Sequence, residues 1–88
     1  MAFVVKMPKM GGNMEYGTIS EWVKQEGETV ERGDLLFTFE TDKTTMDYTA
    51  RKEHGIMLKV MAEEDEQYDI GTPLCIIGEE GENISEYL

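Results

Sequence analysis

The stretch GTISEWVKQEGETVERGDLL (residues 17–36) has the same pattern of glycine, apolar and acidic residues as GIMLKVMAEEDEQYDIGTPL (residues 55–74), which lies 38 positions later. Gly17 coincides with Gly55, and Gly33 with Gly71; the other coincident pairs are Ile19 with Met57, Trp22 with Val60, Glu26 with Glu64, Glu28 with Glu66, Val30 with Tyr68 and Leu36 with Leu74. Matching glycines mark backbone positions with special conformations. The repeat therefore predicts two similar half-domains related by a pseudo-two-fold axis, each too small to bury its own face.

Short strand patterns occupy both halves of the sequence. The expected strands are FVVKM (3–7), TISEWVK (18–24), DLLFTFE (34–40), TTMDYTA (44–50), GIMLKVM (55–61) and PLCIIG (73–78). They are rich in β-branched, aromatic and aliphatic residues, and glycine-containing or acidic breaks separate them. The segments between them have too few apolar residues at helical spacing for an amphipathic helix. We predict an all-β domain whose two sheets pack as a flattened sandwich or barrel.

The repeat also predicts where the join between the two halves lies. The units run from Val5 to Glu40 and from Lys43 to Gly78, so the segment ETDKTT (40–45) connects them. Under a pseudo-two-fold axis, this join and the two chain ends occupy equivalent, opposite positions. The turn at 40–44 is therefore expected at one end of the domain, and both termini at the other.

The length and charge of the chain limit the number of domains it can form and the partners it can bind. A chain of 88 residues makes one domain with a thin core. The net charge of −11 argues against nucleic acid as a partner. It favours solubility, and it serves either encounter with partners that carry basic surfaces or a domain that stays monomeric. We expect the domain to span residues 1–78. Residues 79–88, EEGENISEYL, lose the strand pattern and are expected to begin an acidic linker or a tail.

Few side chains offer catalytic chemistry. The single cysteine, Cys75, lies in the apolar run PLCIIG and is expected in the core, and His54 is the only histidine. These two residues cannot supply a zinc site, and no nucleophile–base pattern accompanies them. No apolar run approaches the roughly 18 residues that span a bilayer, and the opening MAFVVKMPK resembles neither a signal nor a transit peptide. We expect a non-catalytic protein that binds no membrane and is located in the cytoplasm, or in the mitochondrial matrix if it is a mature eukaryotic fragment.

Three segments carry a resemblance to a known family. They are MPKMGGNMEYGTISEWV (7–23), EGETVERGDLLFTFETDKTTM (26–46) and IGTPLCIIG (70–78). In order and spacing they resemble the lipoyl domains of 2-oxo acid dehydrogenase complexes, over about residues 3–78. The most specific element is ETDK (40–43), because in the family this lysine carries lipoic acid in an amide bond. The resemblance implies a flattened β-barrel of two four-stranded antiparallel sheets, with Lys43 in a tight turn at one end.

The resemblance also implies a function. A lipoyl group on Lys43 would act as a swinging arm that accepts an acyl group and two electrons from a thiamine-diphosphate-dependent decarboxylase. The acyl group would pass to coenzyme A at an acyltransferase domain, and dihydrolipoyl dehydrogenase, a flavoprotein, would reoxidise the arm. A lipoate ligase, or a lipoyl transferase and synthase, would attach the cofactor. All the catalytic sites would lie outside this domain.

The family pattern suggests which neighbours of Lys43 take part in recognition. Glu40, Asp42 and Thr44 would contact the modifying enzyme, although the family commonly has alanine in place of Thr44. The loop with Gly11, Gly12 and Asn13 would lie near the turn and help the decarboxylase choose its carrier. The family also usually has glycine where this chain has Asp65.

Two alternatives to a lipoyl domain remain open from the sequence. A biotinyl domain of a carboxylase shares the fold, but its signature places methionine on both sides of the lysine, where this chain has Asp42 and Thr44. A β-domain that is never modified would not need ETDK at the join. Within the lipoyl class, the opening MPKMG resembles pyruvate and acetoin carriers more than those with DIGEG at that point. The parent chain can be a dihydrolipoyl acyltransferase or another component of the complex.

Overall fold

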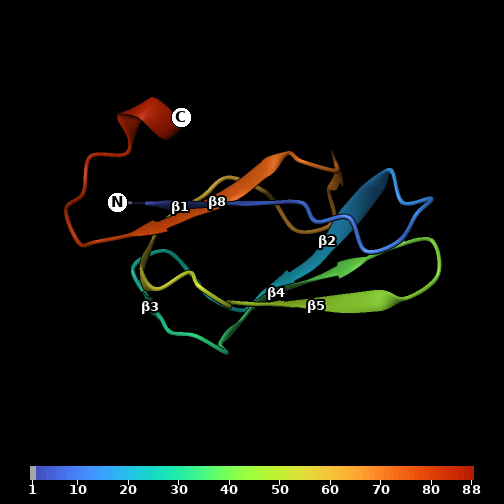
Figure 1. Ribbon diagram of the computed structural model, residues 1–88, viewed down its shortest axis with the longest axis horizontal. Coiled ribbons are helices and arrows are strands. Elements are labelled where there is room, and N and C mark those ends of the chain that lie inside the picture. The colour runs from blue at the N-terminus through green and yellow to red at the C-terminus, as the bar shows by residue number, and fades with distance from the viewer. Residues whose placement is uncertain (1) are drawn as a thin grey trace.

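The computed structural model describes residues 2–88 as two antiparallel sheets that pack face to face (Figure 1). The strands are β1 (Phe3–Lys6), β2 (Tyr16–Trp22), β3 (Thr29–Val30), β4 (Leu35–Glu40), β5 (Thr45–Thr49), β6 (Gly55–Val60), β7 (Gln67–Asp69) and β8 (Pro73–Gly78), and a 3₁₀ turn η1 (Ser85–Tyr87) follows them. One sheet has the order β1-β8-β6-β3 and the other β5-β4-β2-β7. The predicted all-β fold with two four-stranded sheets is thus confirmed.

The pseudo-two-fold relation is visible in the hydrogen bonds. The Glu26 carboxylate accepts the Val60 N–H at 2.8 Å, and the Glu64 carboxylate accepts the Trp22 N–H at 2.9 Å. Each residue of the second bond lies 38 positions from its counterpart in the first, and each bond joins one half of the chain to the other. The strand pairings carry equivalent bulges, between Ile19 and Glu21 and between Met57 and Lys59. Each half thus uses a carboxylate to bond the N–H at the end of a strand in the other half, β2 at Trp22 and β6 at Val60.

The turn at 63–66 shows where the second half departs from the first. Asp65 has a φ of 69°, the one positive value among the non-glycine residues described. The equivalent residue in the first half is Gly27, with a φ of 91°. Both N–H groups cross to the other half, Asp65 to the Ile19 carbonyl at 2.7 Å and Gly27 to the Met57 carbonyl at 2.8 Å. The backbone must therefore hold this conformation, and at Asp65 it does so with a side chain that disfavours it.

Replacing Asp65 with glycine is expected to raise the free energy of unfolding by about 0.5–1 kcal/mol, because the left-handed strain is relieved at a modest entropic cost in the unfolded chain. Urea denaturation measures the change. Asp65→Ala is the control, since it removes the charge from this acidic turn, keeps a Cβ and has no polar side chain that favours the left-handed conformation. Gly27→Ala should shift stability in the opposite direction; no Cβ clash would contribute, since nothing lies within 4 Å of that position. Equal stabilisation by Ala and Gly would show that charge, not backbone strain, is the cause.

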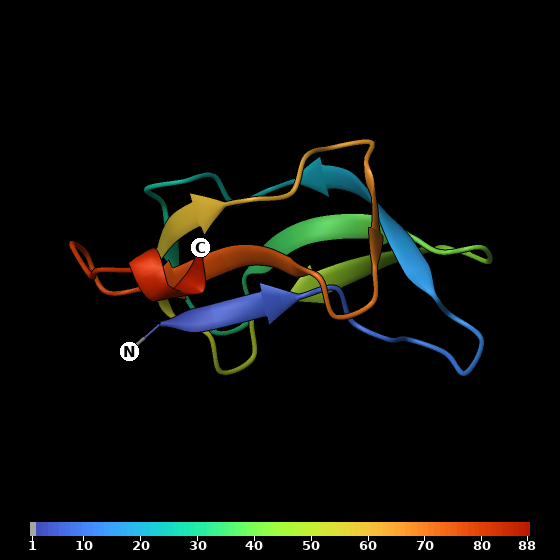
Figure 2. The same ribbon diagram turned by 90° about the horizontal axis from the view of Figure 1, so that it is seen from above.

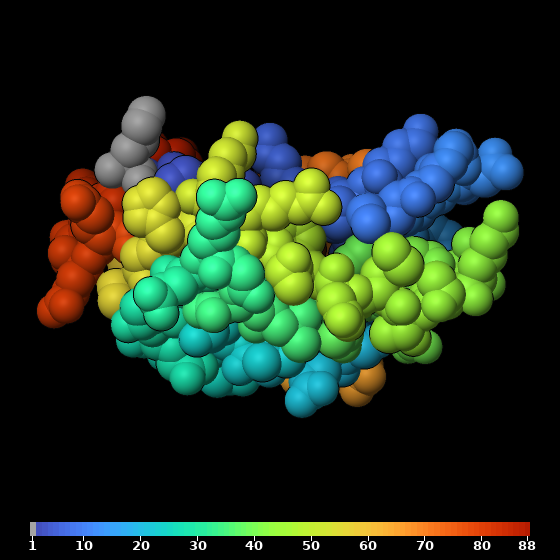
Figure 3. Space-filling view, turned by 60° about the horizontal axis from the view of Figure 1, so that its bottom comes forward, coloured from blue at the N-terminus to red at the C-terminus, as the bar shows by residue number. Residues whose placement is uncertain are grey.

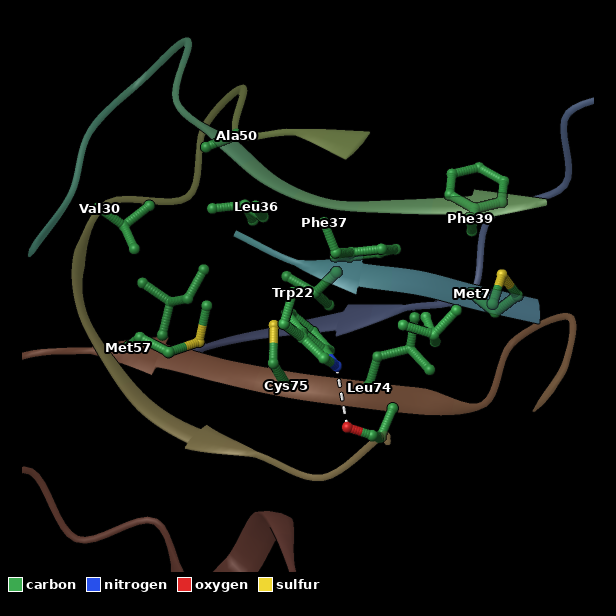
Figure 4. Close-up of a cluster of buried hydrophobic side chains, with 14 residues drawn as sticks. Met7, Trp22, Val30, Leu36, Phe37, Phe39, Ala50, Met57, Leu74 and Cys75 are labelled. Atoms are coloured by element: carbon green, nitrogen blue, oxygen red, sulfur yellow. Dashed lines mark hydrogen bonds between the residues drawn. The ribbon is translucent and has the colours of Figure 1, made fainter. Parts of the chain in front are cut away.

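The core lies between the sheets and is built around aromatic rings (Figure 4). Trp22 is 6% exposed, and its ring centroid lies 4.8 Å from that of Phe37, which is fully buried. The Trp22 indole N–H donates to the Ala62 carbonyl at 2.9 Å, so its one polar group is satisfied. Cys75 lies in the same cluster, as its apolar surroundings predicted. This core fixes β2, β4 and β8 relative to one another.

The β4–β5 turn and the chain termini lie at opposite ends of the elongated molecule (Figure 2). The β4–β5 turn and the loop before β2 project from one end of a body that measures 38 × 25 × 21 Å. The N- and C-terminal segments lie at the other end, where Phe3 of β1 pairs with Ile77 of β8. The predicted placement of the join opposite the termini is confirmed. No helix among residues 2–88 has the length and apolar character needed to cross a membrane.

Two short strands went unrecognised in the sequence, and the C-terminal segment has local structure. β3 and β7 comprise two and three residues, and each forms one of the two edges of its sheet. After β8, the Glu82 N–H donates to the Glu79 carbonyl at 3.0 Å, and η1 follows. The expectation that residues 79–88 begin a linker or a tail remains a prediction.

Candidate functional site

The hairpin turn between β4 and β5 is held closed by Thr41. Its N–H and its hydroxyl both donate to the Thr44 carbonyl, at 2.8 and 3.0 Å. The same hydroxyl oxygen accepts the N–H groups of Lys43, at 3.3 Å, and Thr44, at 3.2 Å. A single threonine hydroxyl thus bonds to three polar backbone groups of the turn, in the manner in which hydroxyls commonly stabilise turns.

Lys43 lies at the tip of this turn with its side chain exposed. No ion pair within 4.0 Å holds its ammonium group among residues 2–88. Its neighbours Asp42 and Thr44 are also exposed, and Glu40 ends β4 opposite Thr45. The Thr44 hydroxyl reaches only the Thr45 carbonyl, at 3.4 Å, so the turn does not depend on it. The turn geometry would therefore tolerate alanine at this position.

The loop before β2 lies against the turn, as the resemblance implied (Figure 3). A hollow of about 200 Å³ separates the two segments; its lining is Met10, Gly11, Gly12, Asn13, Met14, Thr41, Asp42, Lys43, Thr44 and Met46. Met10 is 49% exposed, and its N–H donates to the Met14 sulfur at 3.3 Å. All the predicted recognition residues except Glu40 therefore border one hollow beside Lys43. A lysine amine, flexible methionines and a glycine-rich loop can together present an attachment point and an adaptable contact surface.

The ionisable groups with shifted pKa values do not form a second site. Burial raises the pKa of the Cys75 thiol to about 12, so almost no thiolate is available for nucleophilic chemistry. Burial disfavours the ionised form of Glu53, but hydrogen bonds from the Arg51 N–H and the Tyr48 hydroxyl outweigh it and lower its pKa. Burial and the Glu53 carboxylate raise the pKa of Tyr48 above its ordinary range. Glu53 is buried and satisfied, and is part of the β5–β6 loop structure.

Thr41 is the residue of the site that the sequence did not single out. Threonine is also common in strands, so the residue type at position 41 does not by itself indicate a turn-closing role. The only hint was its position two residues before an exposed lysine, where a hydroxyl can reach the following N–H groups.

The comparisons with known proteins agree with this geometry. Residues 4–77 match the biotin/lipoyl family model, described as "Biotin-requiring enzyme". The dihydrolipoyllysine-residue acetyltransferase component of the pyruvate dehydrogenase complex of Corynebacterium glutamicum is 39% identical over 82 residues, which are 93% of this chain and 12% of that protein. The succinyltransferase component of the 2-oxoglutarate dehydrogenase complex of Staphylococcus saprophyticus is 34% identical over 83 residues, 93% of this chain and 19% of that protein. The dihydrolipoyllysine-residue acetyltransferase component of the acetoin cleaving system of Bacillus subtilis is 35% identical over 86 residues, which are 98% of this chain and 21% of that protein.

The fold and the site define a small two-sheet domain that presents one lysine at its tip. The chain belongs to the biotin/lipoyl family. All three relatives are named for a dihydrolipoyllysine residue, which favours a lipoyl over a biotinyl domain. The chain spans only about an eighth to a fifth of the length of these relatives.

Proposed function

We propose that this chain is a lipoyl carrier domain in which lipoic acid is amide-linked to Lys43. The observation that carries the proposal is the exposed Lys43, without an ion-pair partner among residues 2–88, at the tip of the β4–β5 turn and within a segment that matches the biotin/lipoyl family model. The termini lie at the opposite end, so a tether at the base leaves the tip free. Such a tether would raise the effective concentration of the arm at partner sites.

The residues around Lys43 fit the attachment of a long arm. The ammonium group has open space around it and no carboxylate partner among the described residues, so acylation breaks no ion pair. Bound lipoate supplies a disulfide that can take up an acyl group and two electrons. The domain contributes position: Thr41 orders the turn, and the hollow lined by Met10, Met14 and Met46 offers a partner an apolar contact surface. No catalytic acid or base is required of this chain, and we propose that it is not an enzyme by itself.

Intact-mass measurement tests the attachment. Incubation of the folded domain with a lipoate ligase, lipoate and ATP should add one lipoyl mass per chain, and peptide mapping should place it on Lys43. Biotin with a biotin ligase should add nothing. A biotinyl mass shift would contradict the proposal in favour of the carboxylase class, and no shift with either enzyme would favour an unmodified interaction domain.

We propose further that the parent protein is a dihydrolipoyl acyltransferase of the pyruvate or acetoin type. The opening MPKMG supports this, whereas the relatives include both pyruvate and 2-oxoglutarate components and do not discriminate. The partners would be a thiamine-diphosphate-dependent decarboxylase, the acyltransferase domain and dihydrolipoyl dehydrogenase. Gly11, Gly12 and Asn13 would contact the decarboxylase, and Glu40, Asp42 and Thr44 the ligase.

Reductive acylation of the lipoylated domain measures this partner preference. Purified pyruvate and 2-oxoglutarate decarboxylase components and an acetoin-cleaving component would each be supplied with their substrate, and the acylated domain would be followed by its mass. The pyruvate or acetoin component should acylate the domain with the highest kcat/KM. A clear preference for 2-oxoglutarate would overturn this assignment and leave the lipoyl attachment itself unaffected.

A further inference from the structure

We propose that Thr41 is a positioning residue for the modification of Lys43: its hydroxyl holds the turn in the one conformation that the modifying enzyme recognises. This inference rests on the proposed lipoyl attachment and adds a residue to it that the sequence pattern does not identify. Thr41 does not touch the reacting atoms. It acts through the backbone of Lys43.

The hydrogen bonds of the turn converge on one oxygen. The Thr41 hydroxyl oxygen accepts from the N–H groups of Lys43 and Thr44, at 3.3 and 3.2 Å, and donates to the Thr44 carbonyl at 3.0 Å. Backbone pairing contributes a single bond, from the Thr41 N–H to the Thr44 carbonyl at 2.8 Å. Three of the four hydrogen bonds that close the turn therefore depend on one side chain.

Other side chains of the turn offer no substitute. Asp42 and Lys43 are exposed, and no side-chain hydrogen bond of theirs occurs in the described part of the chain. The Thr44 hydroxyl points to the Thr45 carbonyl, at 3.4 Å, outside the turn. Without the Thr41 hydroxyl, the N–H groups of Lys43 and Thr44 would bond to water, and the turn would sample several conformations.

Placement of the lysine matters because the coupling reaction needs alignment. The ligase first activates lipoate with ATP: a carboxylate oxygen of lipoate bonds to the α-phosphorus, the bond to the β-phosphate breaks, pyrophosphate leaves, and a mixed anhydride with AMP results. The Lys43 Nζ, as a neutral amine, attacks the carbonyl carbon; the N–C bond forms, the bond from that carbon to the phosphate oxygen breaks, AMP leaves, and a proton passes from the amine to solvent. Only the fraction of chains with the turn correctly formed binds productively, so the apparent affinity falls with that fraction.

The expected loss is measurable. Thr41→Val keeps the β-branched shape and removes the hydroxyl. If each lost hydrogen bond changes the turn population by a factor of a few, kcat/KM for lipoylation should fall by about tenfold. The loss should appear in KM, with kcat at saturating domain nearly unchanged. Thr41→Ser should stay within about twofold of the wild type, and Thr41→Asn should recover most of the rate because its side-chain carbonyl can accept the same N–H groups.

The matched control is Thr45→Val, the same chemical change at an exposed threonine next to the turn. Its hydroxyl makes no hydrogen bond among the described residues, so this variant should be modified at the wild-type rate. Thermal melting by circular dichroism checks that every variant is folded. Amide hydrogen exchange at Lys43 and Thr44 should accelerate in Thr41→Val and not in Thr41→Ser.

The outcomes separate the two proposals. If the wild-type domain is not lipoylated at all, the proposed function fails. If the wild type is modified and Thr41→Val is modified equally well, or Thr41→Ser is as poor as Thr41→Val, the positioning role of the hydroxyl is refuted. An equal loss in Thr45→Val would refute it as well, because the effect would then not be specific to the turn.

Discussion

Lys43→Ala is expected to abolish lipoylation and, with it, all acyl transfer through the domain, while the free energy of unfolding stays within about 0.5 kcal/mol of the wild type. The side chain is exposed and makes no described ion pair, so its removal costs no packing. The backbone of the turn is held by Thr41 and is unaffected. Intact mass after ligase treatment and urea denaturation give the two readouts.

Lys52→Ala is the matched control for this prediction. Lys52 is also exposed, in the loop between β5 and β6, and its side chain takes no part in the site. The control should be lipoylated like the wild type. Lys43→Arg keeps the positive charge but should not be modified, because its guanidinium is never a neutral amine near pH 7. A lipoyl mass shift that persists in Lys43→Ala would show that the cofactor is attached elsewhere.

Trp22→Ala is expected to have the largest effect on stability, a loss of about 3–5 kcal/mol. The indole is 6% exposed, packs on Phe37 and donates its N–H to the Ala62 carbonyl. Its backbone N–H also binds Glu64, so the residue lies where the two halves join. A domain of this size has a total stability of only about 5–15 kcal/mol, and much of the variant should be unfolded at moderate temperature. Circular dichroism during urea titration measures the loss.

Two neighbouring substitutions separate the contributions to this loss. Trp22→Phe keeps an aromatic ring near Phe37 but leaves the Ala62 carbonyl without its partner, which should cost about 1–3 kcal/mol on top of a small cavity. Val23→Ala changes the next residue, which is 40% exposed, and should cost much less. If Trp22→Ala were no more harmful than Val23→Ala, the central place of the indole in the core would be wrong.

Much of this fold followed from the repeat, because matched glycines constrain the backbone. Gly33 and Gly71, 38 residues apart, have φ values of 93° and 87°, as equivalent turns require. The longer strands were recognisable because alternation needs several residues to show. The strands β3 and β7 were not, since two or three residues carry no periodicity and pair only after the sheets assemble.

The sequence predicted the position and chemistry of the candidate site, but not the hydrogen bonds that shape it. Its position at the join followed from the repeat, and its chemistry from the resemblance of ETDK. The contact between the 10–14 loop and the turn depends on tertiary packing, so only the family pattern could suggest it. The role of Thr41 was out of reach, because the direction of a hydroxyl is decided by the turn geometry and not by residue type.

The pairing of Phe3 with Ile77 has a consequence for folding kinetics. β1 and β8 lie side by side in the sheet, so forming this contact closes a loop of nearly the whole chain. Closure of a long loop costs conformational entropy before any contact is gained, and all-β domains rich in such distant contacts fold in about milliseconds to seconds. Linking the two ends and opening the chain at the exposed 63–66 turn would convert this contact, now the most distant in sequence among the strand pairings, into a local one.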